Sequence, residues 1–432
     1  MNIAVIGGGI AGLTAAWLLS RHHHVTLFER HARPGLVASS LAVDGVQVDV
    51  PLRVFYPGYY PTLTRLYAQL GVATEPVSYA TTFTGSDGQA FFRWRNLRVG
   101  DWSLPWVLPQ DLATARSRRI ALDAWRFHRL ARAALARQAL AGLSVGDFVR
   151  AHGLSADFVD GLLLPALATI ATCTTEDARR YPAEVVAHYV AAGLARQSVR
   201  RAVHGADDAA TRLLAGITQV VCNAHIESLH QADTHIDLQR RGGAAQRFDH
   251  VVLATQANQA TALWLNPTDD ERAVLAGFKY QALEVVMHRD SGLMPARRRD
   301  WAPVNARVCA EHDRPESTIW VNAVQPALRH AAAVFQTVQP QRAPREALVL
   351  GRAHFERPLV DAGSPWAWAQ LHRLQSGAQA AQRRVWLCGS YAQSGVPLLE
   401  SAVRSAYNVV DAMTCAGSDG ASGPGLAADK TR

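Results

Sequence analysis

Apolar residues follow a strand, helix and strand pattern at the start of the chain. Residues 2–6 form an apolar run with β-branched residues, and the next segment is Gly7-Gly8-Gly9-Ile10-Ala11-Gly12. Residues 13–22 then have helical spacing, and residues 25–30 form a second strand-like run. This order within thirty residues predicts one βαβ unit.

The later pattern predicts two domains that alternate along the chain. Residues 112–201 are mainly helical in pattern, strand patterns return from 219 to 255 and from 283 to 355, and a last apolar strand at 383–390 precedes a helix. We therefore predict an α/β fold with a discontinuous Rossmann-type domain and a second, α+β substrate domain. The expected nucleotide-binding segments are 1–75, 202–262 and 380–415; the substrate segments are 76–201 and 263–379; and the Gly- and Ala-rich residues 416–432 form a disordered tail.

Composition narrows the class of protein. A chain of 432 residues can hold two domains, and no apolar run approaches the length of a membrane span. The glycine-rich turn at residue 7 leaves no room for a signal peptide, so we expect a cytoplasmic protein. The five cysteines are odd in number and lack CxxC spacing, so neither a disulfide framework nor a metal site is expected.

Charge leaves one alternative open. The net charge of +8 comes from 42 Arg and 2 Lys scattered along the chain, which does not predict nucleic-acid binding. Arginines do recur with a helical period among apolar residues between 116 and 137. This segment is either a solvated helix face or a basic amphipathic helix that touches a membrane or an acidic ligand.

The glycine segment carries the first chemical signal. Gly7, Gly9 and Gly12 satisfy GxGxxG between a strand and a helix, where glycines let the backbone approach a pyrophosphate at the helix N-terminus. Ile10 and Ala11 open that helix. Glu29 ends the second strand, where a carboxylate can accept hydrogen bonds from ribose hydroxyls, and Arg30 follows it. These features predict a dinucleotide-binding site, but they do not show whether the dinucleotide is FAD or NAD.

Further motifs resemble the flavin-containing amine oxidase superfamily, which includes amine oxidases, protoporphyrinogen oxidase and phytoene-desaturase-like enzymes. The matching segments are Arg33-Pro34-Gly35-Leu36, the strand around Ile226, the strand 249–255 that ends near Ala254, and the turn and helix VWLCGSYAQSGVPLLESAVRSAYNVV, with Gly389, Leu399 and Ser401. The resemblance implies FAD. Leu36 replaces a glycine and Ser390 replaces an acid of the family pattern. Cys388 does not occupy the family's site for a covalent flavin link, so non-covalent FAD is expected.

The resemblance also implies the kind of reaction. Hydride transfer to flavin N5 needs a dry pocket more than a catalytic triad. We expect Arg53 to hold a carboxylate or enolate and Tyr59, or its neighbours Tyr56 and Tyr60, to donate a proton. The same residues would also fit a packed aromatic loop in which Arg53 makes a structural bond. Two further pocket candidates are Tyr391 and His288. Glu284 falls where many amine oxidases have a lysine, and Lys279 could serve only in a shifted register.

A narrower resemblance covers most of the chain, to bacterial predicted FAD-binding oxidoreductases linked to modified fatty acids. It favours an oxidase or desaturase that removes a hydride from a hydrophobic small molecule or acyl-type substrate. Three alternatives stay open: a redox-neutral isomerase or cyclase, an amine oxidase, and a non-catalytic protein that has lost FAD. The sequence does not specify an oligomeric state.

Overall fold

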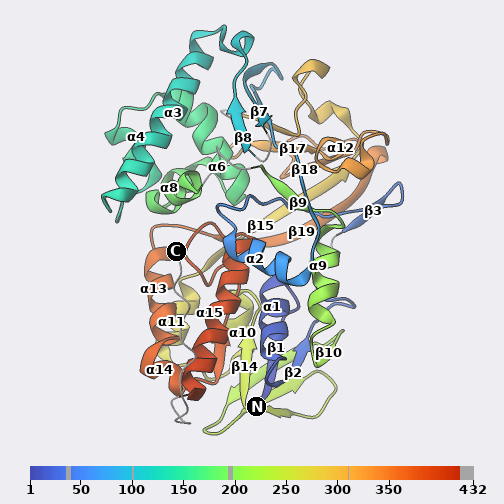
Figure 1. Ribbon diagram of the computed structural model, residues 1–432, viewed down its shortest axis with the longest axis vertical. Helices are drawn as coiled ribbons and strands as arrows, with labels where there is room; N and C mark the ends of the chain where they lie inside the picture. The colour runs from blue at the N-terminus through green and yellow to red at the C-terminus, as the bar shows by residue number, and fades with distance from the viewer. Residues whose placement is uncertain (36–39, 100–101, 193–197, 310, 419–432) are drawn as a thin grey trace.

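The computed structural model describes all residues except 36–39, 100–101, 193–197, 310 and 419–432. One lobe is built on a five-stranded parallel sheet and the other on an eight-stranded mixed sheet (Figure 1). Residues 416–418 of the predicted tail form the end of the last helix, and residues 419–432 lie outside the described residues. Leu36 also lies outside the described residues.

Three distant segments of the chain supply the parallel sheet. Its strand order is β10 (Gln219–Val221), β2 (His24–Phe28), β1 (Asn2–Ile6), β14 (His250–Leu253) and β20 (Val385–Leu387). All neighbouring strands in it run parallel. The predicted α/β class and the discontinuous Rossmann-type unit are therefore confirmed.

Both faces of this sheet are buried, which explains the nearly continuous apolar sequence of its strands. Ile3 and Val5 pack in one cluster with three helices: α1 (Ile10–Leu19), α9 (Gly205–Leu214) and α15 (Leu399–Ser418). Ala4 and Ile6 point the other way. They pack with a small antiparallel sheet and three more helices: β11 (Ile226–Gln231), β12 (Ile236–Arg240), β13 (Gln246–Phe248), α10 (Ala257–Leu263), α11 (Asp269–Ala276) and α13 (Ser364–Leu374). Helices α11 and α13 thus lie on the parallel sheet although their residues fall within the segment 263–379, which was predicted for the substrate domain. The domain boundaries stay a prediction.

The second lobe combines the mixed sheet with a group of helices. The sheet order is β19 (Val349–Leu359), β15 (Lys279–His288), β18 (Phe335–Val338), β17 (Glu316–Trp320), β16 (Val304–Arg307), β6 (Thr81–Thr84), β7 (Ala90–Val99) and β8 (Trp102–Trp106). The helices are α3 (Ala115–Ala136), α4 (Val145–Ala151), α5 (Ala156–Phe158), α6 (Leu164–Ala171), α7 (Thr175–Arg180) and α8 (Ala183–Ala191). The mainly helical pattern predicted for residues 112–201 is confirmed.

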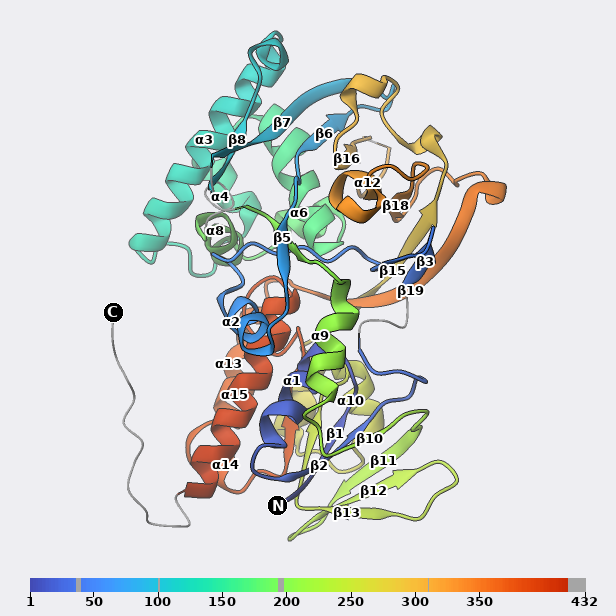
Figure 2. The same cartoon turned by 45° about the vertical axis from the view of Figure 1, so that its right-hand side comes forward.

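Two features join the lobes. The long antiparallel pair β15–β19 runs from the second lobe toward the first (Figure 2), and the segment before α2 (Pro61–Leu70) lies between the lobes. Short strand pairs flank this region: β3 (Leu41–Val43) with β4 (Val46–Val48), and β5 (Thr74–Pro76) with β9 (Arg200–Ala202). Within the described chain, no helix is both long and apolar enough to cross a bilayer.

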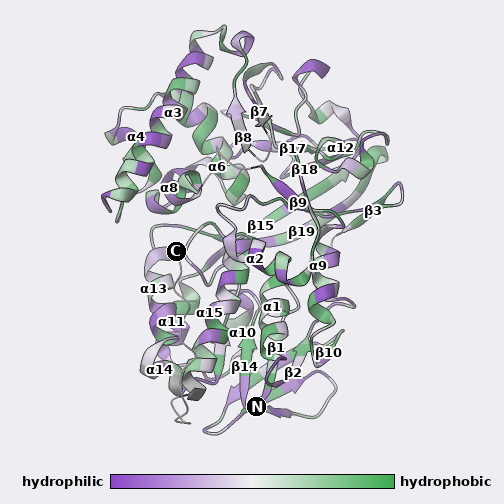
Figure 3. Ribbon diagram, viewed as in Figure 1, coloured by the Kyte–Doolittle hydropathy of each residue, from purple (hydrophilic) through white to green (hydrophobic). Residues whose placement is uncertain are grey.

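Hydropathy follows this architecture. Figure 3 shows hydrophobic colour on β14, a strand of the parallel sheet, and on the neighbouring helix α10, and much hydrophilic colour on α3 and α4 at the outside of the second lobe. The largest buried cluster runs from the α1 side of the parallel sheet through α2 to α8. This continuous packing fixes the segment between the lobes, where the candidate site lies.

Candidate functional site

The glycine turn after β1 is shaped by close backbone contacts. Gly7 has φ of +106°, and a Cβ there would lie 2.8 Å from the carbonyl oxygen of Ala254. A Cβ on Gly12 would lie 1.9 Å from the carbonyl oxygen of Gly7. A Cβ on Gly9, in contrast, would meet no atom within 4 Å. Gly7 and Gly12 are therefore needed for the turn itself, whereas Gly9 leaves open space beside it.

Helix α1 begins at this open space without a side-chain cap. Gly9 is its N-cap residue, the first turn has no acidic side chain, and the first backbone amide to bond within the helix is that of Leu13, to Gly9 O. The amides of Ile10, Ala11 and Gly12 precede it. A helix N-terminus with unbonded amides and partial positive charge is suited to hold a phosphate.

Glu29 lies against the same turn. Its carboxylate accepts hydrogen bonds from the Gly8 amide at 2.7 Å and from the His31 amide at 2.9 Å, and the side chain is nearly buried. The Ala224 amide donates to Glu29 O at 2.8 Å, which brings the segment leading to Ile226 beside Glu29. This arrangement places an acid and the start of β11 together, where the adenosine half of a dinucleotide was expected.

Ala254 and the two arginines differ in how near they lie to the turn. The Ala254 amide donates to Ile6 O at 2.9 Å, so Ala254 is next to Gly7. Arg30 is exposed, and exposed Arg33 pairs with Asp207 on α9 at 3.3 Å. Without movement of its side chain, Arg33 is thus held by α9 and not by the turn.

The C-terminal motif forms a second turn, between β20 and α15. The Gly389 amide donates to Ser405 Oγ at 2.9 Å, and Ser401 Oγ donates to Val396 O at 2.9 Å. Ser390 follows Gly389 and is half-buried, and Leu399 begins the helix. Serines of α15 thus fix both ends of the turn, which explains why small polar residues occupy the start of this helix.

Glu400 has a role that the motif alone did not reveal. Its buried carboxylate accepts hydrogen bonds from the amides of Thr62 at 3.2 Å and Leu63 at 2.9 Å. Because these amides lie at the N-terminus of α2, the charge also complements the dipole of that helix. Glu400 therefore fixes the segment with Tyr59 and Tyr60 relative to α15.

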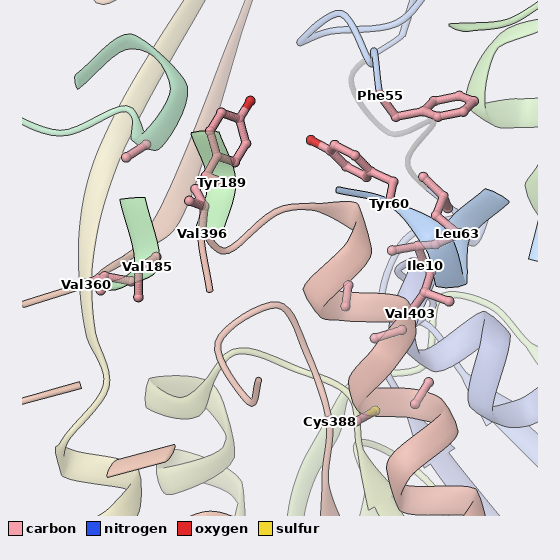
Figure 4. Close-up of a cluster of buried hydrophobic side chains, with 14 of the residues drawn as sticks. Ile10, Phe55, Tyr60, Leu63, Val185, Tyr189, Val360, Cys388, Val396 and Val403 are labelled. Atoms are coloured by element: carbon pink, nitrogen blue, oxygen red, sulfur yellow. The ribbon is translucent and has the colours of Figure 1, made fainter. Parts of the chain in front are cut away.

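Between the lobes lies a group of side chains that we name the tyrosine–arginine cluster. Its members are Arg53, Tyr56, Tyr59, Tyr60, Tyr181, Tyr189 and Arg357. The ring centroids of Tyr59 and Tyr189 are 4.6 Å apart, and those of Tyr56 and Tyr60 are 5.7 Å apart. Tyr59 Oη accepts from the Val396 amide at 2.9 Å, which ties the cluster to the turn before α15. In Figure 4, Tyr60 and Tyr189 project from different elements toward the same space.

The cluster holds two enclosed cations. Burial lowers the pKa of Arg53, an effect that nearby Asp49 partly counteracts. Within the part of the chain that the structure describes, Arg53 Nε has no hydrogen-bond partner. Burial also lowers the pKa of Arg357, a residue that the sequence analysis missed. Arg357 lies in the strand VLGRAHFERPL, which also carries other arginines, and nothing local distinguishes it.

The structure does not bring Glu284 or Tyr391 into this cluster. Leu283 and Val285 face an apolar cluster, so Glu284 between them points to the opposite face of β15 and pairs with Arg352 at 3.3 Å. Tyr391 packs 4.8 Å from Phe278 in the apolar cluster on the other face of the parallel sheet, and its hydroxyl has no partner within the described residues.

The two lesser candidates also have structural contacts. Exposed Lys279 pairs with Asp361 at 2.6 Å. His288 is fully buried and hydrogen-bonds Thr337 Oγ1 at 2.8 Å. Of the residues predicted for chemistry, only Arg53 and the tyrosines 56, 59 and 60 thus lie together.

These residues fit FAD better than they fit a degenerate fold. Open space at Gly9, an uncapped helix N-terminus and a nearly buried acid at Glu29 form the cradle that an ADP moiety needs. Cys388 is completely buried, and burial raises its pKa to about 12, which is typical of an unreactive core thiol.

Comparisons with known proteins agree with this geometry. Residues 5–70 match the family model of an NAD(P)-binding Rossmann-like domain. Among curated proteins, none matches the chain.

Several solved structures are similar along nearly the whole chain. The CLA-producing fatty acid isomerase from P. acnes has a TM-score of 0.67 at 14% identity, covering 95% of this chain and 97% of that one. A redesigned putrescine oxidase has a TM-score of 0.66 at 12% identity, covering 96% and 98%. Cyclohexylamine oxidase from Brevibacterium oxydans has a TM-score of 0.65 at 13% identity, covering 97% and 99%. At such identities the likeness concerns the fold alone, and this chain shares the overall fold of these solved structures.

Proposed function

We propose that the chain is an FAD-dependent oxidoreductase that binds its cofactor non-covalently and takes a hydride from a hydrophobic small molecule or acyl-type substrate. The observation that carries this proposal is the open, uncapped turn at Gly9 beside Glu29, together with the enclosed tyrosine–arginine cluster between the lobes. When bound, FAD would supply the hydride acceptor.

The residues of the nucleotide-binding lobe would hold the cofactor. The amides that begin α1 would bind the pyrophosphate, Glu29 the adenosine ribose, and the start of β11 at Ile226 the adenine. The turn from Gly389 to Leu399 would contact the flavin end, with Ser390 offering a neutral hydrogen bond in place of an acid.

The cluster would orient the substrate and exclude water. Burial raises the pKa of Tyr56, Tyr59 and Tyr60 above the ordinary tyrosine value, so these phenols stay protonated and act as hydrogen-bond donors, not as bases. Arg53, which has an unpartnered Nε, would hold a negative group on the substrate. Glu284 is left out of this assignment because it faces away from the cluster.

A redox-neutral isomerase is the second candidate. The observation in its favour is the similarity to a structure described as a fatty acid isomerase. Such a reaction would use the same cluster but return the hydride to another carbon of the substrate.

Anaerobic spectroscopy separates these functions. The FAD-loaded protein is mixed with acyl substrates and with amines in the absence of oxygen, and the visible absorbance of the oxidised flavin is followed. Bleaching that accompanies formation of a more unsaturated acyl product supports the proposal. Product formation without net bleaching supports the isomerase, and bleaching by amines alone contradicts both.

A further inference from the structure

Arg357 is an enclosed cation without a carboxylate partner. Its Nη2 donates a hydrogen bond to Pro397 O at 3.2 Å, in the turn before α15. No ion pair in the described part of the chain includes Arg357, and the neutral hydroxyls of Tyr181 and Tyr60 lie near it. A guanidinium held in this way has unused donors in a fixed fork.

A second cation, Arg53, adds to the excess of positive charge around Arg357. Arg357 lies near enough to Arg53 to lower the pKa of Arg53, and the buried Nε atom of Arg53 has no hydrogen-bond partner in the described chain. Asp49 is the acid beside Arg53, but its oxygens also accept the Ala206 amide at the start of α9, at 3.1 and 3.2 Å, and burial raises its pKa. The cluster therefore has two guanidinium groups against one carboxylate that is already shared.

A buried hydroxyl points to the same ligand chemistry. Tyr181 is 1% exposed, and its hydroxyl has no hydrogen-bond partner among the described residues. Burial raises its pKa well above the ordinary value, so the phenol keeps its proton and can donate. Buried polar groups without partners are rare in folded proteins, and a ligand that accepts from both Tyr181 and Arg357 would satisfy them.

We infer that the substrate carries a carboxylate, and that Arg357 and the Tyr181 hydroxyl bind it together with Arg53. This inference rests on the proposed function and names its substrate class. Two half-buried cations also disfavour a protonated amine, because like charges near each other repel. The charge of this cluster therefore favours an acyl substrate with a carboxylate over the amine substrate of an amine oxidase.

Three probes with one chain length and different head groups test this inference. Decanoate, decanol and decylamine are titrated separately into FAD-loaded protein, and perturbation of the flavin absorbance gives each Kd. We expect decanoate to bind about tenfold more tightly than decanol, since a charge-assisted bond is worth roughly 1.5–3 kcal/mol and 1.4 kcal/mol is tenfold. Decylamine should bind most weakly.

Substitutions test whether Arg357 and Tyr181 cause the preference for decanoate. Arg357→Gln should weaken decanoate binding by about tenfold or more and leave decanol binding nearly unchanged. Tyr181→Phe removes only an oxygen without partners, so the fold should tolerate it, and decanoate should bind several-fold more weakly. Arg352→Gln is the matched control: Arg352 lies on the same strand, pairs with Glu284 and should affect no probe.

Other outcomes overturn the inference. Decylamine binding as tightly as decanoate would do so, as would decanoate binding that neither variant changes. If Arg357→Gln instead weakens FAD binding and leaves the head-group preference intact, Arg357 serves the flavin and not a substrate carboxylate. A protein that binds no FAD refutes the proposed function instead; decanoate binding is then followed by tryptophan fluorescence, which keeps the two failures distinguishable.

Discussion

At the scale of single residues, the glycines of the first turn have different tasks. Gly12 closes against the backbone of Gly7, whereas Gly9 borders empty space at the start of α1. The GxGxxG spacing alone treats them as equal parts of one motif. The structure separates Gly12, which the turn itself needs, from Gly9, where a Cβ would meet no atom within 4 Å.

This difference predicts opposite phenotypes for two alanine variants. Gly12→Ala should destabilise the protein by about 2–3 kcal/mol, because its Cβ would overlap a backbone oxygen that cannot easily move. Gly9→Ala should leave the thermal midpoint nearly unchanged but weaken FAD binding by about tenfold, because its methyl group would occupy the space of the pyrophosphate. Thermal melting and FAD titration measure both effects. Normal FAD affinity in Gly9→Ala would contradict the assignment of the turn.

His288 shows that a residue proposed for the pocket can act on stability. Its Nε2 bonds Thr337 Oγ1, its Nδ1 accepts the Asp290 amide at 3.1 Å, and burial lowers its pKa to about 4. The unfolded chain, with a His pKa of about 6.5, therefore binds more protons than the native state as the pH falls below that value. The stability contributed by neutral His288 is complete above about pH 6.5 and is lost as the pH falls toward 4.

Urea unfolding measures this loss. Between about pH 7 and pH 4.5, neutral His288 should account for about 2 kcal/mol of the fall in unfolding free energy. His288→Gln keeps a donor and an acceptor but cannot be protonated, so its stability should fall by correspondingly less. Equal pH dependence in both proteins would show that His288 does not stay neutral in the native state.

At the scale of elements, motifs that are contiguous in the sequence could be predicted, but the side of a strand to which a given side chain points could not. Gly7 to Gly12, Glu29 and the turn at Gly389 each belong to one strand–turn–helix segment, so their neighbours are local in sequence. Glu284 was assigned by register, and alternation along β15 turns it away from the cluster. Arg357 was missed because the groups around it, such as Tyr60 and Tyr181, come from distant elements.

Helix α3 contains the arginine-rich segment, which is either a solvated helix face or a basic amphipathic helix that touches a membrane. Leu122 and Trp125 lie on one stripe and are 56% and 55% exposed, with the Arg129 guanidinium 4.7 Å from the Trp125 ring centroid. Ion pairs hold Arg116, Arg119 and Arg126. An exposed aromatic and aliphatic stripe with flanking arginines is suited to an anionic bilayer surface.

Sedimentation with vesicles distinguishes the interpretations. If α3 contacts a membrane, the protein should sediment with phosphatidylglycerol vesicles but not with phosphatidylcholine vesicles, and Trp125→Ser should reduce binding by about tenfold. Trp366→Ser, at an equally exposed tryptophan on α13, is the matched control. Absence of sedimentation by the unaltered protein would leave α3 as a solvated face.

At the scale of the whole molecule, the order of strand and helix patterns was enough to predict two interleaved units. Strands separated by more than 200 residues pair in one parallel sheet, such as β1 with β14. The region between the lobes is formed by joint packing of α2, α8, β19 and α15, which no local pattern specifies. The expected cytoplasmic location stays a prediction.

The visible spectrum of the purified protein tests the central claim most directly. The account predicts a flavin spectrum as purified or after addition of FAD, with free FAD in the supernatant once the protein has been denatured by heat. A colourless protein that takes up no added FAD would contradict the account and leave a Rossmann-type fold without its cofactor.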